Sequence, residues 1–327
     1  MIAAYIGDEA NLKRVYGGKA AARLEKEVRL LPGVFTKDDS EGLKEAEALF
    51  STWGMPSFSE AEIRERFPKL KYLFYAAGTV QAFAAPFLAC GVRVFSAWQA
   101  NAVPVAEFTF AQILLALKGY FTVQRKTRTS RKDALRLFGA YPGGYGVKVG
   151  LLGCGAVGSR VAERLKTTDL EVLAFDPFLS DARAAELGVW KMEMDEIFSS
   201  CDVISNHLAN LPETVGIIKR RHFLSMKPYS IFINTGRGPQ LDEKDLYDAL
   251  TADPTRTALL DVMTEEWDSD LNPLNALENC FITPHIAGSS GQEVMRMADY
   301  MADALECVLS GKPCGYEVTP EMLKTMA

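Results

Sequence analysis

The sequence predicts an α/β protein made of two doubly wound parallel sheets. Short apolar runs alternate with amphipathic stretches, and strands that alternate with helices in this way form parallel βαβ units. The alternation occurs as two series, separated by a long helical pattern at about 103–135. A chain of 327 residues is also longer than a single hydrophobic core usually accommodates. We therefore expect two domains.

The first series supplies the first domain. Its strand-like runs are "IAAYIG" (2–7), "GVFT" (33–36), "ALFSTWG" (48–54), "LKYLFYAAG" (70–78) and "VRVFSA" (92–97). Amphipathic stretches such as 10–28 and 59–67 lie between them and are typical of crossover helices.

The second series follows a loop-like stretch, "FGAYPGGYG" (138–146). Its strand-like runs are "VKVGLLG" (147–153), "LEVLAFD" (170–176), "DVISNHL" (202–208), "SIFINTG" (230–236), "TALLDV" (257–262) and "CFITPH" (280–285). A last amphipathic stretch, 291–309, has apolar residues at helical spacing and is expected to be a closing helix. His222, in "KRRHFLSMK", is expected at an exposed helix start.

Composition narrows the functional class. The formal charge of −6 argues against nucleic-acid or anionic-membrane partners. The acids Asp8 and Glu9 come before an apolar region of sufficient length could form, so we expect no secretory signal. The most apolar stretch, "AVPVAEFTFAQILLAL" (102–117), is interrupted by Glu107, and we expect it to be too short for a membrane span. The six cysteines show neither C-x-x-C nor metal-ligand spacing. We expect reduced thiols, no metal and a cytoplasmic location.

A glycine-rich turn opens the second series. "KVGLLGCGAVGSRVAERL" contains G-x-G-x-x-G at Gly153, Gly155 and Gly158, after a strand and at the start of an amphipathic helix. This context predicts a dinucleotide site, because the glycines allow a tight turn and close approach to pyrophosphate at a helix N-terminus. Asp176 ends the next strand and is placed to bind ribose hydroxyls and repel a 2′-phosphate. No arginine follows it, which favours NAD over NADP.

Three later strand ends carry polar residues that packing alone does not explain. Arg237 follows "FINTG", and His285 lies in "FITPHIAGS". Asp261, Glu265 and Glu266 lie in "LLDVMTEEW". Ligands of open α/β sheets bind outside the carboxyl ends of the strands. An arginine suits a 2-keto acid's carboxylate, a histidine can exchange a proton with the oxygen, and a carboxylate keeps that histidine cationic.

These motifs, in this order, resemble the D-isomer-specific 2-hydroxyacid dehydrogenase family. The resemblance covers nearly the whole chain and includes "VPVAEFTFAQILLAL", "LLGCGAVG", "INTGRG", "LLDVMTEE" and "TPHIAG". It implies a Rossmann NAD domain (103–285) inserted in a flavodoxin-like substrate domain (1–102 and 286–327). It also implies a small 2-hydroxy or 2-keto acid as the substrate and a homodimer formed through the cofactor domain.

The resemblance also implies roles for single residues. Arg237 looks like the substrate-binding arginine, His285 like the acid/base and Glu266, five residues after Asp261, like its carboxylate partner. The turn of Ala77, Gly78 and Thr79 resembles the loop whose N–H groups bind the substrate carboxylate. Expected cofactor contacts, besides the three glycines and Asp176, are Ala156, Val157, His207, Thr235, Asp261 and Gly288.

The chain departs from the family pattern beside the arginine. The usual T-A-R-G is Thr235-Gly236-Arg237-Gly238, which is expected to add flexibility there. Ala209 and Trp267 replace prolines that are common in the family. Two alternatives remain. One is a formate or phosphite dehydrogenase, although formate dehydrogenases carry glutamine where this chain has Glu266. The other is a non-enzymatic NAD-sensing corepressor.

Overall fold

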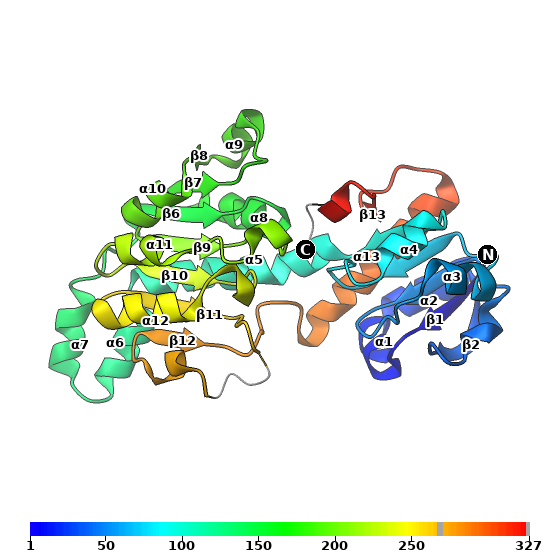
Figure 1. Ribbon diagram of the computed structural model, residues 1–327, viewed down its shortest axis with the longest axis horizontal. Helices are drawn as coiled ribbons and strands as arrows, with labels where there is room; N and C mark the ends of the chain where they lie inside the picture. Colours follow the sequence, from blue (N-terminus) through cyan, green and yellow to red (C-terminus); the bar gives the residue numbers. More distant parts are fainter. Residues whose placement is uncertain (267–270, 325–327) are drawn as a thin grey trace. The chain divides into compact units, whose positions relative to one another are not determined.

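The computed structural model describes residues 1–266 and 271–324 and consists of two compact α/β units (Figure 1). One unit comprises residues 1–102 and 289–327, and the other comprises 103–288. Both units are built on largely parallel sheets, which confirms the predicted fold class.

The first unit contains a six-stranded sheet in the order β13-β5-β4-β3-β1-β2. All neighbours pair in parallel except β13, which pairs antiparallel with β5 at the edge. The strands are β1 (Ile2–Ile6), β2 (Arg29–Phe35), β3 (Ala48–Ser51), β4 (Tyr72–Tyr75), β5 (Arg93–Ser96) and β13 (Glu317–Val318). The order of the five parallel strands is that of a flavodoxin-like sheet.

Helices and a ladder of aromatic rings complete this unit. Its helices are α1 (Glu9–Val15), α2 (Lys19–Glu27), α3 (Glu60–Arg66), α4 (Ala84–Ala89) and α13 (Val294–Ser310), with 3-10 turns η1 (Ser40–Leu43), η6 (Gly291–Glu293) and η7 (Met322–Lys324). Phe74 stacks between Phe50 and Phe95, with ring centroids 5.0 and 4.9 Å apart. All three rings are fully buried on neighbouring strands and fix the register of the sheet core.

The second unit contains a seven-stranded parallel sheet in the order β12-β11-β10-β9-β6-β7-β8. The strands are β6 (Tyr145–Leu152), β7 (Asp169–Phe175), β8 (Trp190–Lys191), β9 (Val203–Asn206), β10 (Ile231–Asn234), β11 (Thr257–Leu260) and β12 (Cys280–Ile282). The chain reverses direction across the sheet between β6 and β9. This topological switch point is where such sheets bind nucleotides.

The predicted long helix at 103–135 is wrong as a single element. Three helices occupy the region: α5 (Trp98–Leu117), α6 (Tyr120–Thr127) and α7 (Arg131–Phe138). Gly119, at φ +63°, separates α5 from α6. A Cβ on Gly119 would lie 2.3 Å from the Tyr141 ring. Ser130 begins α7 by accepting a hydrogen bond from the Asp133 N–H.

The remaining helices of the second unit connect its strands. They are α8 (Ala156–Leu165), α9 (Asp181–Leu187), α10 (Met194–Ser200), α11 (Arg220–Ser225) and α12 (Glu243–Ala252), with 3-10 turns η2 (Pro212–Thr214), η3 (Gly238–Gln240) and η5 (Pro273–Ala276).

Among the described residues, α5 is the one helix long and apolar enough to cross a bilayer by length and composition. Its 20 residues correct the expectation that this apolar stretch is too short. About 56% of its apolar window is buried inside the protein, as in the core helix of a domain.

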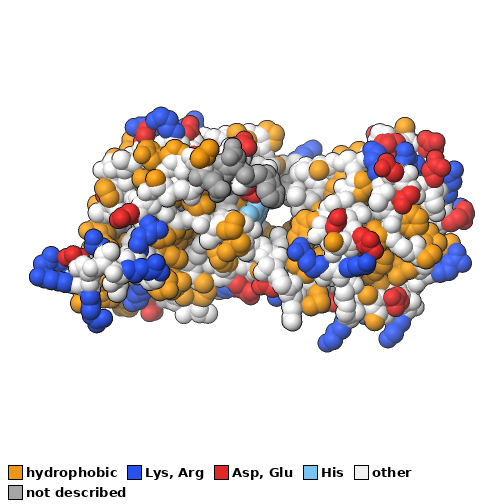
Figure 2. Space-filling model, turned by 90° about the horizontal axis from the view of Figure 1, so that it is seen from below, with side chains coloured by type: hydrophobic (Ala, Val, Ile, Leu, Met, Phe, Trp, Pro, Cys, Tyr) orange, Lys and Arg blue, Asp and Glu red, His pale blue; other side chains and the backbone are white. Residues whose placement is uncertain are grey.

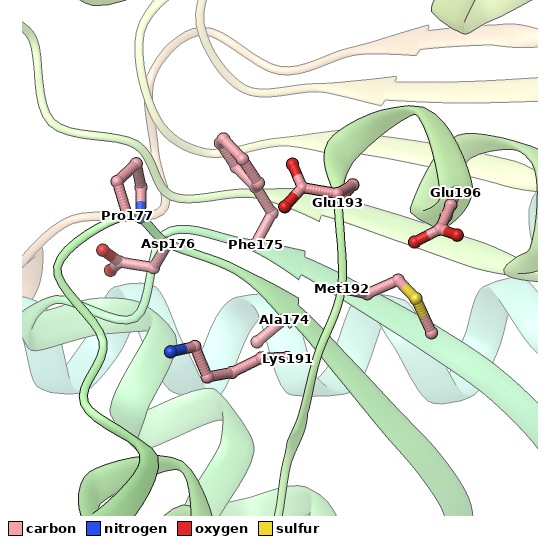
Figure 3. A pocket seen from close by; sticks show the side chains of 8 residues that line it. All are labelled: Ala174, Phe175, Asp176, Pro177, Lys191, Met192, Glu193 and Glu196. Carbon is pink, nitrogen blue, oxygen red and sulfur yellow. The ribbon is translucent and has the colours of Figure 1, made fainter.

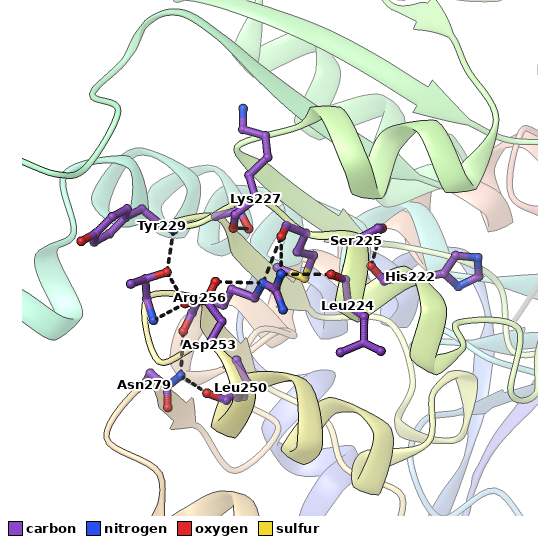
Figure 4. A network of polar contacts seen from close by, with 12 residues as sticks. His222, Leu224, Ser225, Lys227, Tyr229, Leu250, Asp253, Arg256 and Asn279 are labelled. Atoms are coloured by element: carbon purple, nitrogen blue, oxygen red, sulfur yellow. Dashed lines mark hydrogen bonds and ion pairs between the residues drawn. The ribbon is translucent and has the colours of Figure 1, made fainter.

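A structural network closes the amino-terminal edge of the second sheet (Figure 4). The Arg256 guanidinium donates to the carbonyls of Leu224 and Met226, at the end of α11. The Asn279 amide donates to two further carbonyls, those of Leu250 and Arg256.

His222, on α11, is buried rather than exposed as expected. Its ring stacks on Phe198 with centroids 5.1 Å apart, and it accepts a hydrogen bond from the Lys219 N–H. These contacts make it a structural histidine.

Candidate active site

The glycine-rich turn between β6 and α8 is shaped by direct backbone packing. A Cβ on Gly153 (φ +88°) would lie 2.8 Å from the His207 carbonyl oxygen, and one on Gly158 would lie 2.0 Å from the Gly153 oxygen. A Cβ on Gly155 would meet nothing within 4 Å. Two glycines are therefore required by the fold, whereas the third leaves the turn open beside the N-terminus of α8. This geometry suits a bound pyrophosphate. Ala156 and Val157 form the first turn of that helix.

Asp176 lies at the end of β7, beside this turn. Its carboxylate accepts hydrogen bonds from the N–H groups of Cys154 (2.7 Å) and Phe178 (2.8 Å). It therefore joins the glycine turn to the end of β7.

A pocket of about 590 Å³ opens next to Asp176 (Figure 3). Its lining consists of Ala174, Phe175, Asp176, Pro177, Lys191, Met192, Glu193 and Glu196. The Lys191 amino group lies on the same side of the pocket as the Asp176 carboxylate and pairs with Asp181 at 2.8 Å. Sequence reasoning missed Lys191, because it reaches this pocket only through the pairing of β7 with β8.

His207 follows β9 and is held as a neutral ring. Burial lowers its pKa to about 3. One ring nitrogen contacts the Ser205 hydroxyl at 3.0 Å and the other the Thr235 hydroxyl at 3.4 Å. Thr235 in turn contacts Thr109 of α5 at 3.1 Å. These contacts connect two strand ends and a helix beneath the glycine turn.

Arg237 follows β10 and is half-buried. Its Nη1 donates to the Gly236 carbonyl at 2.8 Å, and no carboxylate in the described part of the chain lies within 4 Å of the guanidinium. Burial lowers the pKa of Arg237, and the charge of Glu266 opposes this shift. A partly buried guanidinium of this kind is prepared for an anion.

His285 and Glu266 meet at the ends of β12 and β11. Nδ1 of His285 lies 2.9 Å from a carboxylate oxygen of Glu266, and the histidine side chain remains 47% exposed. Nε2 therefore faces away from the pair and is available for proton transfer. The structure brings Glu266, rather than its neighbour Glu265, to the histidine.

His285 adopts a left-handed backbone conformation, with φ +55°. The buried Asp261 carboxylate holds this turn through the Thr283 hydroxyl (2.6 Å) and the N–H groups of Ile286 and Ala287 (both 2.8 Å). Both carboxylate oxygens of Asp261 thus serve the histidine turn, which continues to Gly288. A left-handed residue other than glycine is strained, and such strain persists where surrounding contacts enforce it.

The arginine turn and the Glu266 loop are packed directly together. A Cβ on Gly238 would lie 2.1 Å from the main-chain carbon of Met263. The Glu243 carboxylate accepts from the Thr264 N–H at 2.7 Å and from the Asn272 amide, on either side of Glu266. Sequence reasoning missed Glu243, since an acid in the first turn of a helix is common on any surface.

The remaining predicted site residues belong to the other unit. Ala77, Gly78 and Thr79 follow β4, and the Ser96 hydroxyl lies within hydrogen-bond distance of the carbonyls of Ala77 (3.0 Å) and Gly78 (2.6 Å). Within the described residues, no cluster of three or more His, Cys, Asp or Glu side chains is arranged to hold a metal ion.

Known protein families and proteins are similar to this chain in sequence. Residues 110–287 match the model of the D-isomer specific 2-hydroxyacid dehydrogenase, NAD binding domain. The chain is 34% identical over 223 residues to a D-3-phosphoglycerate dehydrogenase of Archaeoglobus fulgidus, covering 68% of this chain and 42% of that protein. It is 35% identical over 168 residues to a hydroxypyruvate reductase of Blautia hydrogenotrophica, covering 51% and 52%.

Solved structures share the fold. A D-mandelate dehydrogenase of Rhodotorula graminis matches with a TM-score of 0.81 at 20% identity, covering 97% of each chain. The chain spans about half the length of the curated relatives that it matches.

Proposed function

Because the chain belongs to the D-isomer-specific 2-hydroxyacid dehydrogenase family, we propose that it interconverts a small 2-keto acid and its D-2-hydroxy acid with NAD. A glyoxylate or hydroxypyruvate reductase-like activity is the form we favour. The 2.9 Å contact between His285 and Glu266 is the observation that carries the proposal, because it pairs a partly exposed histidine with a carboxylate.

Each residue has one task in the proposed reduction. Arg237 binds the carboxylate of the keto acid. His285 donates a proton from Nε2 to the keto oxygen, while Glu266 stabilises the imidazolium through Nδ1. When bound, NADH would supply a hydride to C2. In the oxidation, His285 accepts the hydroxyl proton instead.

The nucleotide is assigned to the glycine turn and the Asp176 pocket. The open side of Gly155 and the N-terminus of α8 fit the pyrophosphate, and the acidic lining of the pocket favours a ribose without a 2′-phosphate. On the family resemblance, we assign His207, Thr235, Asp261 and Gly288 to the cofactor, and Ala77, Gly78 and Thr79 to the substrate.

We also propose a homodimer formed through the second unit. Exposed apolar side chains on α6 and α7 support it: Tyr120, Leu135 and Phe138 are 50%, 59% and 49% exposed. Basic side chains gather in the same region (Figure 2). A cytoplasmic location is consistent with the six unpaired cysteines.

A panel of 2-keto acids tests the proposal. NADH consumption is measured with glyoxylate, hydroxypyruvate, pyruvate and bulkier acids. NADH formation from NAD is measured with formate and with phosphite. Turnover of at least one keto acid is expected, and Arg237→Ala should raise its KM about 100-fold, as expected for a lost charge-assisted bond. NADH binding without turnover would favour a corepressor, and formate or phosphite oxidation would favour the other enzyme class.

A further inference from the structure

Three fully buried carboxamides lie beneath the arginine turn. Asn206 ends β9, Asn234 ends β10, and Gln240 ends η3. The Asn206 amide donates to the Asn234 oxygen at 3.0 Å and to the Gln240 oxygen at 2.6 Å. They form one connected group among apolar strands.

This group holds the main chain of the arginine on both sides. The Arg237 N–H donates to the Gln240 oxygen at 3.1 Å, and the Arg237 carbonyl accepts from the Asn234 amide at 3.2 Å. The Gly236 N–H donates to the Asn234 oxygen at 3.0 Å. The backbone that carries the guanidinium is therefore fixed by the side chains of Asn234, three residues before Arg237, and Gln240, three residues after it.

Gln240 uses its full hydrogen-bonding capacity. Its oxygen accepts from Asn206 and Arg237, and its amide donates to the carbonyls of Leu208 and Ala209, both at 2.9 Å. Any apolar replacement would leave buried main-chain groups without partners. The side chain thus connects the loop after β9 to the arginine turn.

The same network explains the glycine that precedes the arginine. A Cβ on Gly236 would lie 2.9 Å from the Gln240 oxygen and 3.0 Å from the Asn206 amide. The two amides therefore occupy the place that the alanine of the usual T-A-R-G would need. Gly236 makes room for a rigid network, which corrects the expectation that it adds flexibility.

We infer that Gln240, supported by Asn206 and Asn234, is a positioning residue for substrate binding. It touches no substrate and acts by fixing the main chain of Arg237, so that the guanidinium is held ready for the carboxylate of the keto acid. The inference rests on the proposed function, in which Arg237 binds that carboxylate.

Gln240→Met tests the inference, because it keeps the length of the side chain and removes its hydrogen bonds. We expect the KM for the keto acid to rise about tenfold, with smaller changes in kcat and in the KM for NADH. Asn279→Leu is the matched control: it also removes a buried amide that donates to two carbonyls, at the opposite edge of the same sheet. The control should lower the melting temperature and leave the KM for the keto acid unchanged.

A double-mutant cycle separates positioning from a general structural role. In an Arg237→Lys background, Gln240→Met should add little to the KM for the keto acid, since the guanidinium that Gln240 positions is no longer present. A wild-type KM in Gln240→Met, or an equal rise with and without Arg237, would overturn the inference. If Gln240→Met does not fold, Gly236→Ala provides the same test by pushing a methyl group against the network.

Binding of oxalate, measured by calorimetry, decides the inference without turnover. Gln240→Met should weaken oxalate binding about tenfold, and unchanged binding would contradict the positioning role. A wild-type protein that binds oxalate through Arg237 but reduces no keto acid would refute the proposed function alone. A wild-type protein that does not bind oxalate would overturn the inference as well.

Discussion

Asp261→Asn should displace the histidine that transfers the proton. The side chain is 2% exposed, and its two oxygens accept three hydrogen bonds from the turn around His285. Asparagine has the same shape but only one acceptor oxygen. In its better orientation the amide group faces the Ala287 N–H, so that one bond is lost and two donors oppose each other.

The size of the effect follows from these contacts. A hydrogen bond to a charged acceptor contributes about 1.5–3 kcal/mol, whereas a left-handed residue other than glycine costs about 1–2 kcal/mol. Losing one such bond is therefore enough to release His285 from φ +55° in a large fraction of molecules. We expect the free energy of unfolding to fall by about 2 kcal/mol. A misplacement of about 1 Å in the histidine ring should lower kcat about 100-fold.

The assay combines urea unfolding with steady-state kinetics of keto-acid reduction. Asp253→Asn is the matched control, because Asp253 also holds a turn, through the Thr255 N–H (3.1 Å) and hydroxyl (2.6 Å), at the opposite edge of the sheet. The control should lose stability and keep its kcat. Unchanged kcat in Asp261→Asn would refute the reasoning. A raised KM for NADH with unchanged kcat would show that Asp261 contributes to cofactor binding alone and does not position His285.

Three further predictions concern the same sheet edge. Glu266→Gln should lower kcat for keto-acid reduction, because the carboxylate that lies 2.9 Å from Nδ1 of His285 is replaced by a neutral amide; a wild-type kcat would contradict this role. Gly238→Ala should reduce both stability and kcat/KM, since its methyl group would lie 2.1 Å from the Met263 main chain. Wild-type values of both would show that the arginine turn and the Glu266 loop move independently. Burial lowers the pKa of His207 from 6.5 to about 3, so the free energy of unfolding should fall as the pH drops below about 6.5, where only the unfolded chain binds this proton. His207→Gln should weaken that acid dependence in urea titrations, and an unchanged dependence would assign it to other groups.

The sequence predicted the features that depend on local pattern. The alternation of strands and helices gave the fold class, and the context of Gly153 and Gly158 gave the turn after β6, because both depend on residues close together in the chain. The prediction of one long helix at 103–135 is wrong because two residues inside the helical pattern interrupt it. Gly119 separates α5 from α6, and Ser130 begins α7.

Features that depend on pairing between distant strands were not predictable in the same way. Lys191 reaches the Asp176 pocket only through β8, and the left-handed turn at His285 depends on bonds from Asp261, 24 positions earlier in the chain. Periodicity carries no information on such contacts. Polar residues inside apolar runs do carry a signal, since Asn206 and Asn234 end buried strands and need buried partners.

Gly236 shows how such a signal changes an interpretation. Taken alone, a glycine in place of the family's alanine predicts a looser arginine turn, because glycine has more backbone freedom than any other residue. The buried oxygen of Gln240 and the amide of Asn206 fill the space of the missing methyl group, and the same Gln240 oxygen accepts a hydrogen bond from the Arg237 N–H. The substitution therefore has to be interpreted together with the two polar residues. If that is correct, Gly236→Ala should cost less in a Gln240→Val background than in the parent protein, and equal costs in the two backgrounds would restore the simpler view of a flexible turn.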